Sequence, residues 1–122
     1  MAATAITNTV LKRNEAKAMP TAATVAKTDG ALVTFDKDDQ KILLLLKNNV
    51  TNATHTAVIK AGNGLQGVSD LEVTLDAGAE ACVVVESGRF MDVSGANKGK
   101  VNIVSKDTTT GTQIEVRAIV LP

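Results

Sequence analysis

Short apolar runs rich in β-branched residues recur along most of the chain, and turn-forming residues separate them at intervals of about ten residues. In "DLEVTL" the apolar Leu71, Val73 and Leu75 alternate with polar residues, as they do in a strand with one buried face. No long amphipathic helix pattern lies between the runs. The pattern therefore predicts an all-β fold: an antiparallel β-sandwich or jelly-roll-like barrel of about seven or eight short strands.

Residues 1–29 differ from the rest of the chain in composition and in apolar pattern. They are rich in Ala and Thr, contain Pro20, and show no convincing apolar stripe, although 8–19 could form a short helix. We expect an extended N-terminal arm over 1–29 that lies outside the core, followed by one β-sandwich domain over 30–122. A chain of 122 residues is long enough for one domain with a real core.

The expected strands can be placed from the apolar runs and the turns between them. They are residues 31–36, 40–48, 55–61, 70–75, 79–87, 89–93, 100–105 and 113–122. We expect turns at 76–78 and, between the last two strands, at 107–112, where "DTTTGT" favours a hairpin.

The strand "QKILLLLKN" is apolar on both faces. Leu43 and Leu45 point to one side of a strand while Leu44 and Leu46 point to the other, so the four cannot all enter one core. Either the N-terminal arm or another subunit must cover the second pair. We interpret the surplus as a sign of oligomerisation or of docking on a larger assembly.

The stretch "AGNGLQG" contains the spacing G-x-G-x-x-G at Gly62, Gly64 and Gly67. A dinucleotide-binding loop with this spacing needs a helix after it, because the helix N-terminus holds the pyrophosphate. Here a strand pattern follows, so we expect no nucleotide. We expect instead a connection between strands, with glycines at positive φ and a tight turn at Asn63-Gly64.

No group of residues points to catalysis or to metal binding. His55 is the only histidine and has no recognisable nucleophile or orienting partner, and Cys82, the only cysteine, is expected to be a buried, inert thiol. "DKDD" at 36–39 lacks the spacing of a calcium loop and is expected to be a solvated turn. We therefore expect no catalytic residue, no cofactor and no metal, and a protein that is not an enzyme.

Charge and aromatic content argue against several classes of partner. Thirteen basic residues balance thirteen acidic ones, and Phe35 and Phe90 are the only aromatic residues. We expect no nucleic acid or glycan ligand, because both rely on basic patches or exposed aromatic faces. Residues 1–20 lack the pattern of a secretory leader, and no run of about 18 apolar residues indicates a membrane span.

Several textural motifs resemble small structural proteins of tailed-bacteriophage virions, which are taken to be head decoration or auxiliary capsid proteins. The resemblance covers roughly residues 1–122 and is carried by "KAGNGLQGVSDL", "DAG", "VESGRFMDVSGANKGKV" and the terminal "AIVLP". It implies a β-sandwich or jelly-roll-like domain, often trimeric, that sits on the capsid lattice. It also implies an extended N-terminal segment that contacts the shell or a neighbouring subunit.

On this resemblance we expect a non-enzymatic decoration protein that binds the major capsid protein as a homo-oligomer, with a trimer favoured. It would be made in the bacterial cytoplasm and located on the capsid surface. A tail or head–tail connector component is the first alternative; a host-surface or glycan adhesion module and, more remotely, a hydrolase are the others. The residues expected to make the contacts are Thr4, Ile6, Val10, Leu11, Leu43 and Leu45.

Overall fold

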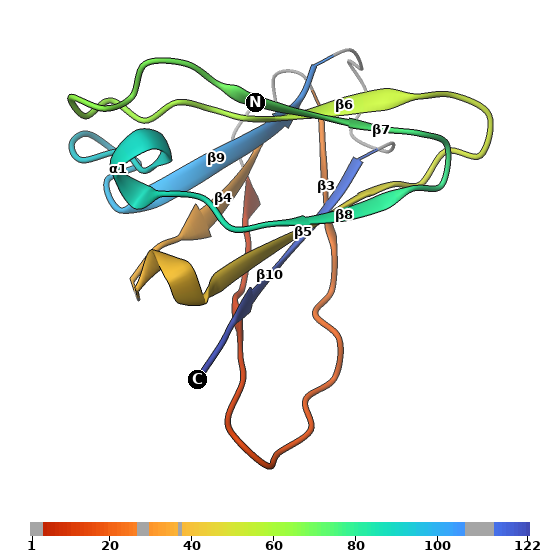
Figure 1. Ribbon diagram of the computed structural model, residues 1–122, viewed down its shortest axis with the longest axis horizontal. Coiled ribbons are helices and arrows are strands. Elements are labelled where there is room, and N and C mark those ends of the chain that lie inside the picture. Colours follow the sequence, from red (N-terminus) through yellow and green to blue (C-terminus); the bar gives the residue numbers. More distant parts are fainter. Residues whose placement is uncertain (1–3, 27–29, 37, 107–113) are drawn as a thin grey trace.

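The computed structural model describes residues 4–26, 30–36, 38–106 and 114–122, and it has the predicted all-β, sandwich-like fold (Figure 1). Sheet A contains, in spatial order, β1 (Thr4–Ala5), β4 (Ala31–Thr34), β9 (Lys100–Ser105), β6 (His55–Ile59) and β7 (Leu71–Leu75). Sheet B contains β2 (Thr9–Val10), β10 (Ile114–Val120), β5 (Ile42–Asn48) and β8 (Glu80–Val83), and β3 (Ala23–Val25) also pairs with β10. The segment 107–112, predicted as a turn, lies outside the described residues.

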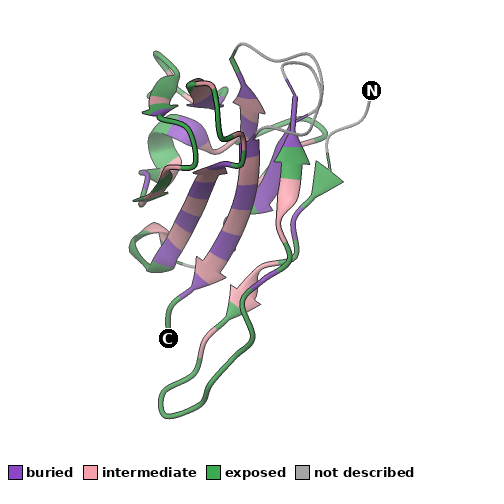
Figure 2. Ribbon diagram, turned by 90° about the vertical axis from the view of Figure 1, so that its right-hand side faces the viewer, coloured by how far each residue is buried: buried purple, intermediate pink, exposed green. Residues whose placement is uncertain are grey.

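The core lies between the two sheets and follows from side-chain alternation. Along β5, Ile42, Leu44 and Leu46 are buried, whereas Leu43 and Leu45 between them are only half-buried. Along β10 the same alternation is visible as bands of two colours in Figure 2. Because successive side chains of a strand point to opposite faces, β5 and β10 each give one row of residues to the core. The prediction that Leu43 and Leu45 lie on the other face of the strand is confirmed.

The N-terminal segment is more closely integrated with the sandwich than an arm outside the core. Its strands β1 and β2 pair in parallel with β4 and β10, whereas every other strand pair in the two sheets is antiparallel among the residues described. The sheets are therefore mixed, not wholly antiparallel. Ile6 and Val25 are buried, so the expectation that 1–29 contributes nothing to the core is wrong. No helix forms within 8–19.

The expected strand at 89–93 does not form: its first two residues end one turn of helix, α1 (Ser87–Phe90), and Met91 and Asp92 make only isolated β-bridges. The side chain of Asp39 accepts a hydrogen bond from the Ser87 backbone N–H at 2.8 Å, which fixes the first residue of the turn. The turn places Phe90 in the core, and Arg89 lies over its ring with the guanidinium carbon 5.0 Å from the ring centre. A contact between residues 48 positions apart thus overrides the local strand pattern.

Candidate interaction surfaces

The first candidate surface is the segment between β2 and β3, which projects from the sandwich as a long turn (Figure 1). Residues 12–19 are exposed, and Asn14 has a φ of 61°, in the left-handed region that Asn tolerates well. We call residues 11–19 the projecting turn. Of the residues expected to make contacts, Val10 is exposed at its base and Leu11 is half-buried.

Both ends of the projecting turn are fixed to β10. The Leu11 backbone N–H donates to the Val120 carbonyl at 2.8 Å, and the Arg117 Nε donates to the Pro20 carbonyl at 3.0 Å. Thr4 and Ile6, the other expected contact residues of the arm, pair through their backbone N–H groups with Gly30 and Leu32. Thr4 is exposed, whereas the side chain of Ile6 is in the core and is not available to a partner.

The glycine loop at 60–70 is held firmly against α1 and the segment that follows it. The Gly62 N–H donates to the Arg89 carbonyl at 2.9 Å, and Asn63 exchanges hydrogen bonds with Val93 N, Asp92 Oδ1 and the Ser94 carbonyl at 2.8–3.2 Å. A Cβ at Gly62 would clash with the Met91 carbonyl. Close approach of backbones explains this glycine.

The expectation of positive φ in this loop is wrong. Among the glycines that the structure describes, those with positive φ are Gly78, Gly95 and Gly99, in other turns. A Cβ at Gly67 would clash with the Gly62 carbonyl, so the loop folds tightly upon itself. Its glycines let the loop fold compactly. Because the strand β7, and not a helix, follows the loop, no helix N-terminus is formed here to present its N–H groups.

The tip of this loop exposes two large apolar side chains. Leu65 is fully exposed and Val68 is 84% exposed, and Val93 is exposed on the neighbouring segment. At the base, the Ala61 N–H donates to Asp70 Oδ1 at 2.7 Å and Lys60 Nζ lies 3.1 Å from Asp70 Oδ2. The hydrogen bond from Ala61, with help from Lys60, lowers the pKa of Asp70. The loop is thus fixed at its base by a charged carboxylate.

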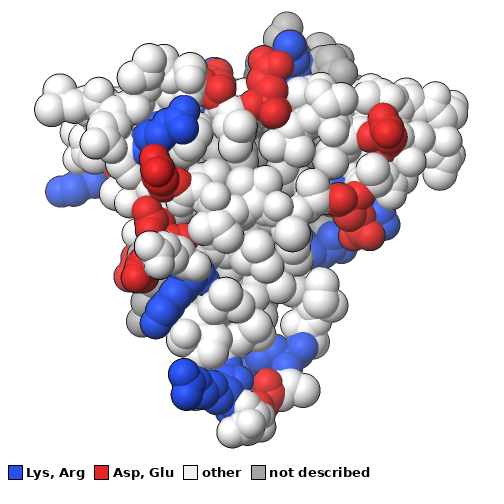
Figure 3. All heavy atoms as spheres, in the orientation of Figure 1, with Lys and Arg blue, Asp and Glu red and all other residues white. Residues whose placement is uncertain are grey.

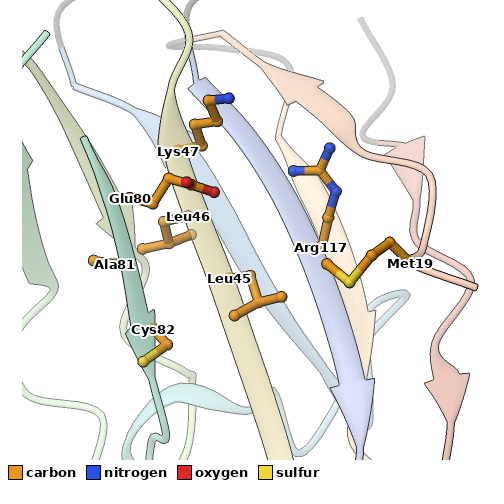
Figure 4. A pocket seen from close by; sticks show the side chains of 8 residues that line it. All are labelled: Met19, Leu45, Leu46, Lys47, Glu80, Ala81, Cys82 and Arg117. Atoms are coloured by element: carbon orange, nitrogen blue, oxygen red, sulfur yellow. The ribbon is translucent and has the colours of Figure 1, made fainter. Parts of the chain in front are cut away.

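A second candidate surface is the outer face of sheet B, where Leu43 and Leu45 lie. Register places Leu45 between Arg117 of β10 and Cys82 of β8. A groove of about 340 Å³ runs over this face (Figure 4). The residues lining the groove are Met19, Leu45, Leu46, Lys47, Glu80, Ala81, Cys82 and Arg117. Met19 is the residue of the N-terminal segment that lines this groove.

Cys82 is exposed, so the prediction of a buried thiol is wrong. Its neighbours Ala81 and Val83 pack against the core, and alternation turns Cys82 outward. Because the run "ACVVV" is apolar at every position, its sequence does not indicate which of its side chains face the core.

The other residues considered for chemistry have structural roles or stand apart from one another. Asp38 accepts a hydrogen bond from Gln40 N at 3.0 Å in the 3-10 turn η1 (Asp39–Lys41), and the hydrogen bond from Ser87 N lowers the pKa of Asp39. Lys37 lies outside the described residues.

His55 begins β6, opposite Leu75. Among the residues that the structure describes, no three His, Cys, Asp or Glu side chains gather in a way that could hold a metal ion.

One polar residue in the core was not singled out from the sequence. Asn48 is fully buried at the end of β5, and its Nδ2 donates to the carbonyls of Ala53, Leu75 and Asp76 at 2.8–3.3 Å. Its Oδ1 accepts from Val50 N at 3.2 Å. Asn48 thereby ties two connections together at this end of the sandwich. "NNVTN" indicated only a turn, and nothing in it distinguished Asn48 from its neighbours.

Comparison with known proteins does not assign the chain to a group. No protein-family model matches it, and no curated protein or solved structure shows significant similarity to it. Within the described part of the chain, no helix has the length and apolar character needed to cross a membrane.

Proposed function

We propose that this chain is a structural protein of a tailed-bacteriophage virion, which binds the outer surface of the capsid as an oligomer and reinforces it. The proposal makes it a decoration protein without enzymatic activity, with the major capsid protein as its partner. The motifs described above suggest the class, and the all-β sandwich is compatible with it. The observation that carries the proposal is the projecting turn, which is bonded to β10 at both ends and stands out from the sandwich.

The anchoring of the projecting turn favours binding. Because β2 and β3 both pair with β10, the turn leaves and rejoins the same edge of sheet B. A loop fixed at both ends loses less conformational entropy on binding than a free terminal arm does. The turn thus provides a partly pre-organised element that can contact the shell while the sandwich stays outside it.

The charge of the turn indicates which surface it would contact. Lys12, Arg13 and Lys17 are basic and Glu15 is the one acidic residue, whereas the whole chain has a net charge of zero. Blue atoms surround one red group at the foot of the molecule in Figure 3, where the turn projects. Glu15 lies 3.2 Å from Lys17, which leaves Lys12 and Arg13 to face a partner. An acidic depression on the shell fits this charge.

Cosedimentation with expanded shells that lack the protein tests the proposal. Deleting 1–29 would remove Ile6 and Val25 from the core, so a sharper variant replaces residues 12–18 with a short Gly-Ser linker. We expect wild type to pellet with the shells and the linker variant to stay in solution with an unchanged unfolding curve. Wild type that never pellets would overturn the decoration role, and equal pelleting of both would overturn the role of the turn.

A matched pair of charge variants tests the electrostatic part. We expect Lys12→Glu/Arg13→Glu to weaken shell binding at least tenfold, and Lys41→Glu/Lys98→Glu, which changes net charge equally on exposed positions of the body, to leave it within about twofold. Raising the salt concentration should weaken wild-type binding. If both double variants bind alike, contact through the turn is not charge-driven.

Electron microscopy of the native particle separates the capsid from other locations. Density for the sandwich on the head lattice supports the proposal. Density on the tail or at the head–tail connection would favour that alternative instead, and absence from the particle would count against both and reopen the adhesion module.

A further inference from the structure

The groove on the outer face of sheet B has an apolar floor and a neutral rim. Leu45 and Cys82 form the floor, and Met19 stands at the border beside Arg117 (Figure 4). The rim carries both signs: Lys47 pairs in register with Glu80, and Arg117 Nη1 lies 3.3 Å from Glu115 Oε1. Such a groove accepts an uncharged, apolar side chain more readily than a charged one.

The tip of the glycine loop has the complementary character. Residues 61–69 contain no charged side chain, and the exposed Leu65 and Val68 stand on a backbone fixed by the hydrogen bonds to Arg89 and Asp92. A large apolar side chain held rigidly in water gains free energy when a partner covers it.

The tip cannot fill the groove of its own chain. It is bound to α1 and the segment after it, at the end of the sandwich where β5 begins (Figure 1). The groove lies over the second half of β5, on the outer face of sheet B. The hydrogen bonds of Gly62 and Asn63 keep the two apart, so another molecule must supply whatever covers either one.

We infer that this molecule is a second copy of the chain: the tip at Leu65 and Val68 of one copy occupies the groove at Leu45 and Cys82 of the next. This contact joins two different surfaces, and repetition of such a contact closes a ring when the rotation allows it. The inference deepens the oligomeric part of the proposed function and rests on it. It also identifies what covers Leu45, a side chain that the sequence indicated must be covered.

Sedimentation velocity of the purified chain without shells tests the contact from both sides. We expect Leu65→Ser and Leu45→Gln each to raise the dissociation constant of the oligomer at least tenfold. Leu121→Ser removes an exposed leucine elsewhere, and Val104→Gln changes a half-buried residue on the outer face of sheet A; both should assemble as wild type does. A wild type that remains monomeric at every concentration overturns the inference, as does assembly that ignores Leu65→Ser and Leu45→Gln.

A cross-link between two single-thiol proteins identifies the surfaces that meet. Wild type carries only the groove thiol, Cys82, and Val68→Cys/Cys82→Ala carries only a thiol at the tip. With a short bis-maleimide we expect a mixture of the two to give a covalent dimer of one chain of each kind. Dimers of wild type alone, with none mixed, would show groove against groove and overturn the inference.

Shell binding is scored separately, so that the two proposals fail in different ways. A monomer that still pellets with shells leaves capsid binding standing and removes both the oligomer and its tip-in-groove contact. An oligomer that cross-links from tip to groove but never pellets with shells does the reverse.

Discussion

The two outer faces of the sandwich carry different sets of side chains. On sheet A, Lys106 lies 2.9 Å from Glu72, and the hydroxyls of Thr56 and Thr74 are 3.2 Å apart. On sheet B, the central positions of β5 are the aliphatic Leu43 and Leu45, beside the thiol of Cys82. Both faces carry charged pairs, but on sheet B these pairs form the rim of a groove with an apolar floor, whereas on sheet A they lie beside Val58 and Val104.

The two kinds of surface differ in how they behave in water. Cross-strand pairs of opposite charge or of hydroxyls suit a sheet surface that stays in water. An apolar surface beside a groove gains free energy only when something covers it. The comparison therefore separates residues that serve the fold from residues that we propose serve association, and it can be tested strand by strand.

The largest effect is expected from the two faces of β5 itself. Leu44→Ala opens a cavity in the core and should lower the free energy of unfolding by about 2–5 kcal/mol. Leu45→Ala, one residue along, removes a half-buried side chain and should cost less than about 1 kcal/mol while the chain is monomeric. Urea unfolding at low protein concentration measures both. Equal losses would place Leu45 in the core and remove the contrast between the faces.

The second effect concerns the polar residue that interrupts the apolar inner face. Asn48→Ala leaves the carbonyls of Ala53 and Leu75 without this donor and should cost about 1–3 kcal/mol. Asn49→Ala is the matched control, because Asn49 is exposed and its side-chain amide donates to Glu115 Oε2 at 3.0 Å. We expect it to stay within about 0.5 kcal/mol of wild type in the same urea titration. A cost for Asn49→Ala as large as that for Asn48→Ala would contradict the role given to the buried amide.

The regular strands could be predicted from the sequence because their environment is periodic. β9 and β10 alternate between buried and half-buried positions, largely in step with the order of apolar and polar residues, whereas in the edge strand β7 only Leu75 is buried and Leu71 is exposed. In β5 the four leucines and Ile42 hide the phase, yet the count of apolar residues still showed that one face lacked a cover.

The rest depends on contacts between distant residues. β1 and β2 have two residues each, too few for any period, and exist because β4 and β10 offer free edges. α1 depends on Asp39, far away in sequence. The groove also needs Met19 from the arm beside β5 and β8, and no local pattern predicts that meeting. Hence the candidate face was found from the sequence, and its groove was not.

A third prediction concerns acid stability at the edge of sheet A. The pKa of Asp70 is lowered in the folded protein, so its carboxylate stabilises the fold above the ordinary Asp pKa of about 3.9. That contribution is lost as the pH falls through the lowered pKa. Asp70→Asn should therefore lower Tm modestly at pH 7, and its difference from wild type should shrink toward acid pH. A difference in Tm that stays constant from neutral to acid pH would mean that Asp70 acts by shape alone.

The smallest effect is expected from the exposed ion pair on sheet A. Both side chains of the Lys106–Glu72 pair are about half exposed, so Glu72→Gln should change the free energy of unfolding by at most about 0.5 kcal/mol, and salt should reduce the change further. The same substitution also tests whether the outer face of sheet A takes part in association. If sheet A faces water, Glu72→Gln leaves sedimentation of the oligomer unchanged, while Leu45→Gln on sheet B does not. A shift in the dissociation constant on Glu72→Gln would show that both outer faces meet neighbours, and the contrast between paired charges and apolar groove would no longer separate fold from association.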